Sequence, residues 1–88
     1  MKLPFEEQYL GDNTYIRILN SATPVGDFEW HRDHEDRKVT PLESNDWLFQ
    51  MDNELPIPIN KELFIPKGVY HRVIPGTGLL RIKLVKLI

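Results

Sequence analysis

The 88-residue sequence contains no cysteine. This absence excludes disulfide bonds, thiolate catalysis and cysteine-based zinc sites. A domain this small must therefore be stabilised by its core, by self-association or by a bound metal. No apolar run approaches the roughly 18 residues of a membrane-spanning helix, and residues 1–10 lack the apolar stretch of a signal peptide. We expect a soluble cytoplasmic protein without a membrane partner.

An excess of basic residues is also missing. Eleven Lys and Arg stand against thirteen Asp and Glu, which gives a net charge of −2, whereas nucleic-acid-binding domains are usually basic. The length leaves room for one hydrophobic core. The sequence therefore predicts a single domain over residues 1–88, with residues 1–12 as a loosely packed N-terminal segment, and no nucleic-acid partner.

Amphipathic helical periodicity is the third absence, and seven prolines are scattered along the chain. What recurs is short strand-like segments separated by turn signals, a pattern typical of all-β sandwiches and barrels. We predict strands at 14–19, 28–33, 37–43, 47–52, 63–66, 70–74 and 79–88, with a proline-rich connection at 53–60. So many strands in so short a chain predict a small closed or double-sheet β structure, with free edges paired in a homodimer.

Residues 31–38 form a run of eight ionisable side chains. Such a run fits a solvated hairpin tip, but two of its members have a spacing that suits a ligand site. His31 and Asp33 lie two residues apart, which on a strand places both side chains on one face, about 6.6–7 Å apart. They can then converge on one ion, and Glu35 would extend the same face. Further along, Pro66 and Gly68 predict a tight turn that leaves His71 near the start of a strand.

Together these segments resemble the two motifs of the cupin superfamily over about residues 25–85. In the second motif, G-x5-P-x-G-x2-H-x3-N, the P, G and H positions are Pro66, Gly68 and His71. Asn60 replaces the leading Gly and Pro75 the final Asn. In the first motif, G-x5-H-x-H-x3,4-E-x6-G, the two histidine positions hold His31 and Asp33. The motif's Glu falls at Arg37 or Lys38, so that ligand is missing.

The resemblance implies a small jelly-roll barrel, also called a double-stranded β-helix, with a metal site built from His31, Asp33 and His71. Two histidines and one carboxylate are the facial triad of non-haem Fe(II) oxygenases. We therefore expect a divalent metal, Fe(II) before Mn, Ni or Zn, and an activity of the dioxygenase type. The expected partner is a small-molecule ligand or substrate, with anions among the candidates.

Three further residues are predicted to contact a substrate. Arg81 lies ten residues after His71, where 2-oxoglutarate oxygenases of similar fold often place an arginine. Its strand alternates, however, so that Leu80, Ile82 and Leu84 share the opposite face. Gln50 and Glu35 are the other two candidates. A solvated surface position is the alternative for each.

Two other functions stay open. One is a metal-free cupin that acts as a sugar epimerase or isomerase, with His31 as a general base oriented by a carboxylate. The other is a non-catalytic module that binds a small molecule. Neither the substrate nor the reaction follows from the sequence.

Overall fold

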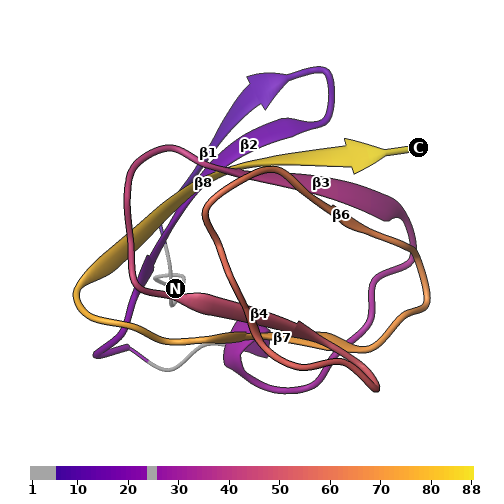
Figure 1. Ribbon diagram of the computed structural model, residues 1–88. Coiled ribbons are helices and arrows are strands. Elements are labelled where there is room, and N and C mark those ends of the chain that lie inside the picture. Colours follow the sequence, from indigo (N-terminus) through magenta and orange to yellow (C-terminus); the bar gives the residue numbers. More distant parts are fainter. Residues whose placement is uncertain (1–5, 24–25) are drawn as a thin grey trace.

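The computed structural model describes residues 6–23 and 26–88, which form two antiparallel β-sheets that face each other (Figure 1). The larger sheet contains, in spatial order, β1 (Glu6–Gly11), β2 (Thr14–Asn20), β8 (Leu79–Leu87), β3 (Asp36–Pro41) and β6 (Leu63–Ile65). The smaller sheet contains β5 (Ile57–Pro58), β4 (Leu48–Met51) and β7 (His71–Ile74). This arrangement confirms the predicted all-β fold of the jelly-roll type.

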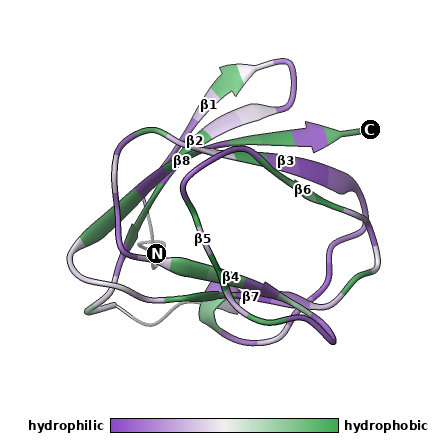
Figure 2. Cartoon of the chain, in the orientation of Figure 1, coloured by the Kyte–Doolittle hydropathy of each residue, from purple (hydrophilic) through white to green (hydrophobic). Residues whose placement is uncertain are grey.

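Alternation along the strands explains where the core lies. In β8, Leu80, Ile82 and Leu84 are buried, while Arg81 and Lys83 between them are exposed. The fully buried Trp47 and the buried Phe49 face these side chains from the smaller sheet. Side chains of a strand alternate between its two faces, so each sheet supplies one apolar layer. In the neighbouring strand β3 most residues are hydrophilic, as Figure 2 shows, and Val39 is the residue that it buries in the core.

Turn chemistry holds the strands in register. The turn after β1 has positive φ angles at Gly11, Asp12 and Asn13, of 92°, 53° and 58°. Glycine, asparagine and aspartate are the residues that adopt this left-handed region most readily. The turn pairs β1 with β2, with Glu7 opposite Arg17. Part of the expected loose segment, Glu6–Gly11, is therefore a strand, whereas residues 1–5 lie outside the described residues.

The predicted strand at 28–33 is wrong. Residues Gly26–Phe28 form a short 3-10 helix, η1, and within 29–33 the ladder is reduced to one isolated bridge at His31. The Phe28 ring packs 5.7 Å from the Trp47 ring, measured between centroids. Apolar contact with the core therefore favours a turn here over the extended conformation that the sequence pattern suggested. Among the described residues, no helix is long and apolar enough to cross a membrane.

The turn between β7 and β8 carries the chain from the smaller sheet to the larger one. The amide of Thr77 donates a hydrogen bond to Asp46 Oδ1 at 2.7 Å, which ties this turn to the loop before β4. Gly76 lies so close to Asp46 that a Cβ atom would be 2.7 Å from the Asp46 carbonyl oxygen. Only glycine fits this approach without displacing the backbone of the loop.

We expect Gly76→Ala to destabilise the fold by about 1–3 kcal/mol, because the added methyl group overpacks a backbone contact. Gly26→Ala is the matched control, since a Cβ atom at Gly26 meets no atom within 4 Å. Thermal denaturation followed by circular dichroism would compare the two variants. Equal melting temperatures would show that the contact at Gly76 is not tight.

The hydrogen bonds from Thr77 lower the pKa of the Asp46 carboxyl below its usual value. A carboxyl with a lowered pKa stabilises the fold above its unfolded value of about 3.9, and this contribution is lost as the pH falls through the folded pKa. We expect Asp46→Asn to be less stable than the wild type at pH 7 and to approach it below about pH 4. Denaturant unfolding across pH 3–7 would measure this, with the exposed Asp52→Asn as the control. A stability difference between wild type and Asp46→Asn that stays constant across this range would contradict the assignment.

Candidate metal centre

A backbone bridge brings the histidines of the two motifs together, although 40 positions separate His31 from His71. The His31 amide donates to the His71 carbonyl oxygen at 3.0 Å, and the His71 amide donates to the His31 carbonyl oxygen at 2.8 Å. Their imidazole rings consequently lie 4.3 Å apart between centroids. His71 is buried at the start of β7, and its ring contacts Phe49.

The turn at Pro66–Gly68 places the third member of the group. The Val69 amide donates to the Pro66 carbonyl oxygen, and Gly68 has a φ of 76° at the third position, where a type II turn needs a left-handed residue. The Gly68 amide in turn donates to the carbonyl oxygen of Asp33 at 2.9 Å. This turn therefore fixes the backbone of Asp33 next to His71.

The side chains of His31, Asp33 and His71 offer three donor atoms that all lie within 4.8 Å of one another. His31 Nδ1 is 2.8 Å from the carbonyl oxygen of Glu29, and His71 Nδ1 is 2.9 Å from that of Val69. A carbonyl oxygen only accepts hydrogen bonds, so we assign a hydrogen to both Nδ1 atoms. In neutral rings, both Nε2 atoms then carry lone pairs suited to a metal ion.

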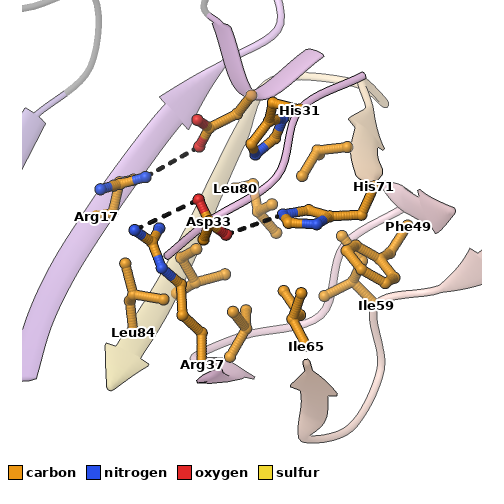
Figure 3. Close-up of a pocket in the computed structure, with 14 residues that line it drawn as sticks. Arg17, His31, Asp33, Arg37, Phe49, Ile59, Ile65, His71, Leu80 and Leu84 are labelled. Carbon is orange, nitrogen blue, oxygen red and sulfur yellow. Dashed lines mark hydrogen bonds and ion pairs between the residues drawn. The ribbon is translucent and has the colours of Figure 1, made fainter. Parts of the chain in front are cut away.

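The Asp33 carboxylate lies between the His71 imidazole and the Arg37 guanidinium (Figure 3). Its Oδ2 lies 3.2 Å from His71 Nε2, and its Oδ1 lies 3.4 Å from an Arg37 nitrogen. Oδ2 is buried and has no hydrogen-bond donor among the described residues. Two lone-pair atoms facing each other at 3.2 Å repel unless a positive charge lies between them. Either a metal ion or a proton on His71 supplies that charge.

Two opposing influences set the ionisation of Asp33. Burial is the largest and raises the pKa of this carboxyl, but the 3.2 Å contact with the His71 ring and the positive charge of Arg37 together outweigh it. The pKa of Asp33 is therefore below its usual value. The carboxylate form that a metal ion requires is already favoured at neutral pH.

A cavity of about 40 Å³ adjoins the three side chains and extends between the two sheets. Its walls are mainly apolar and include Phe49, Ile65, Leu80 and Ile82. This volume holds a few water molecules or a comparably small group. It is far below the roughly 300–1,000 Å³ of pockets that enclose larger ligands.

Three more charged residues line the cavity: Arg37, which stands at one of the two positions expected for the first motif's Glu, and Arg17 and Asp27, which the sequence analysis did not single out. Arg17 lies 2.6 Å from a Glu7 oxygen and 3.0 Å from an Asp27 oxygen. A signal for Arg17 was present, because it shares a strand face with the buried Leu19 two residues later. No comparable signal marks Asp27, which lies in η1.

Arg37 connects the cavity to Glu35. Its guanidinium lies 2.7 Å from a Glu35 oxygen and 3.4 Å from an Asp33 oxygen. Glu35 is thus near the cluster but points to Arg37, and it does not line the cavity. Its predicted contact with a substrate stays a prediction.

The other two predicted substrate residues lie outside the cavity. Gln50 donates to the Glu54 carbonyl oxygen and accepts from Arg72 Nε at 3.0 Å, so it belongs to the outer face of the smaller sheet. Arg81 is about half exposed and faces Glu43 at 3.6 Å on the outer face of the larger sheet. The outward direction of Arg81 agrees with the alternation of β8. A substrate role for either residue stays a prediction.

Comparisons with known proteins find similar structures but no similar sequences among family models or curated proteins. A cupin-2 domain-containing protein from Shewanella frigidimarina superposes with a TM-score of 0.62 at 16% identity, over 91% of this chain and 76% of that one. A cupin domain from Bordetella pertussis gives a TM-score of 0.57 at 20% identity, over 100% and 99% of the two chains.

The DMSP lyase DddQ from Ruegeria pomeroyi is a third similar structure, with a TM-score of 0.62 at 15% identity. The match covers 86% of this chain but 39% of the lyase, so the lyase is much the longer protein. Structural similarity at sequence identities this low establishes the fold and not the activity. The resemblance read from Pro66, Gly68 and His71 is confirmed at that level, and the chain has the cupin fold.

Proposed function

We propose that this protein binds one divalent metal ion through His31, Asp33 and His71. The observation that carries the proposal is the buried Asp33 Oδ2, which lacks a hydrogen-bond donor and faces His71 Nε2 at 3.2 Å. A metal ion would satisfy both atoms and His31 Nε2 together. Backbone carbonyl oxygens orient both rings, as they do for many metal-binding histidines.

The donor set favours Fe(II), because two imidazoles and one carboxylate on one side of an ion leave positions open for substrate and dioxygen. We therefore propose an Fe(II)-dependent oxygenase, with Mn, Ni and Zn as the other ions that such donors accept. Bound iron would supply activation of dioxygen. His31 and His71 would hold the ion, Arg37 would keep Asp33 ionised, and the apolar walls would exclude bulk water from it.

A metal-free isomerase is the second candidate, and one observation supports it. The Asp33–His71 contact is also the geometry of an imidazolium paired with a carboxylate, which is a common arrangement for proton transfer. The cavity volume of about 40 Å³ argues against a nucleotide sugar held inside it. A non-catalytic module that binds a small molecule would use the same cavity.

Self-association stays a prediction. The strands β1 and β6 form the edges of the larger sheet, and unpaired edges are the positions at which sheets of two copies join. Val85 is partly exposed and Leu87 is exposed on β8, so both are candidates for such a contact.

Elemental analysis of untagged protein tests the metal site. We expect close to one equivalent of Fe, Mn, Ni or Zn in the wild type, after anaerobic loading with Fe(II) if necessary. Asp33→Asn and His71→Gln keep the side-chain size and should lower metal affinity at least 10–100-fold, since even the loss of a supporting residue has an effect of that size.

His34→Gln is the matched control for these variants. His34 is exposed and lies one residue after Asp33, outside the three-residue group. The control should keep its metal, and circular dichroism should show all variants folded. A wild type that takes up no metal under these conditions, or an Asp33→Asn variant that keeps full occupancy, would contradict the proposal.

A further inference from the structure

Two guanidinium groups line the cavity beside the proposed metal ligands, and each forms ion pairs with carboxylates. Arg17 contacts Glu7 and Asp27, and Arg37 contacts Glu35 and Asp33, all at 2.6–3.4 Å. Charge-assisted contacts of this kind are strong, and breaking them to admit another anion leaves a carboxylate unpaired. The two arginines therefore carry no uncompensated charge for a ligand.

We propose that the site takes a small aliphatic monocarboxylate and discriminates against dicarboxylates. This inference rests on the metal site proposed above. A divalent ion held by two neutral imidazoles and the Asp33 carboxylate has one net positive charge, which matches one anionic head group. The first carboxylate of a ligand is thus accommodated at the ion.

A second carboxylate on the same ligand would find no cation. Arg17 and Arg37 are the Lys and Arg side chains that line the cavity among the described residues, and both are neutralised. Arg81, which the sequence suggested for this task, lies on the outer face beside Glu43. A buried charge without a partner is strongly unfavourable, so the second carboxylate would be rejected.

The body of the ligand must be short and apolar. Beyond the three donor side chains and the paired charges, the cavity wall consists of aliphatic side chains and Phe49, among them Ile65 and Leu80. About 40 Å³ of space lies between them. Removing a few methyl or methylene groups of the ligand from water against this wall favours binding.

Butyrate and succinate are the matched pair of probes, because they have equal chain lengths and differ by one carboxylate. Each would be titrated into Co(II)-loaded protein, with the visible spectrum of Co(II) and the methyl NMR signals of Ile65 and Leu80 as readouts. We expect butyrate to bind at least about tenfold more tightly than succinate, the effect of leaving one charged group unsatisfied. The methyl signals should shift only if the ligand enters the cavity.

Variants that free a guanidinium test the cause of the discrimination. Glu35→Gln removes one of the two carboxylates at Arg37, so it should raise succinate affinity and reduce the ratio between the probes severalfold. Glu43→Gln changes the net charge equally but frees Arg81 outside the cavity, and it should leave the ratio unchanged. If Glu35→Gln does not fold, Glu35→Asp, whose shorter side chain weakens the contact with Arg37, makes the same test, with Glu43→Asp as its control.

The outcomes separate the two proposals. Failure of the wild type to bind Co(II) would overturn both the metal site and this inference. Co(II) binding with equal affinity for butyrate and succinate would overturn the inference and leave the metal site standing. The same would follow if Glu43→Gln changed the ratio as much as Glu35→Gln.

Discussion

The candidate site depends on one pair of backbone hydrogen bonds, those that join His31 to His71. The segment between η1 and β3 has no regular structure of its own, and its backbone pairs with the smaller sheet at this bridge. An antiparallel pair of this kind sets the Cα atoms about 5.5 Å apart and sends both side chains to the same side. The imidazoles reach each other for that reason, and the turn at Gly68 adds Asp33 through its carbonyl oxygen.

Charge organisation at this site follows a consistent pattern. Each cation near the cavity is placed against a carboxylate, and the polar hydrogens of both histidines are used by backbone carbonyl oxygens. The exception at the site is Asp33 Oδ2, which is buried without a donor. Buried polar atoms are rarely left this way, and each exception calls for an explanation. Because this oxygen faces His71 Nε2 at 3.2 Å, a positive charge between the two atoms would satisfy it.

The sequence predicted the strands and the second motif well because both depend on local rules. The alternation of β8 and the turn at Gly68 need only neighbouring residues to be recognised. The segment 28–33 was predicted wrongly because its conformation depends on the packing of Phe28 against Trp47, which is distant in sequence. His31 and Asp33 nevertheless converge. The backbone bridge to His71 and the hydrogen bond from the Gly68 amide position them, in place of the continuous strand that was expected. The pairing of Arg17 with Asp27 joins residues ten positions apart on different elements, which spacing alone does not reveal. Arg37 instead pairs with Asp33 and Glu35 within four residues, so its contacts are local in the sequence.

The distance along the chain between the two histidines has a consequence for a sequence without cysteine. An ion held by His31, Asp33 and His71 would close a loop of about 40 residues that includes β3, β4, β5 and β6. Cross-links across loops of such length restrict the unfolded chain, as disulfides do, and a metal that binds only the folded form adds its binding free energy to folding. The same three side chains would then act as a covalent bridge does in a secreted domain, but as one whose strength follows the concentration of free metal.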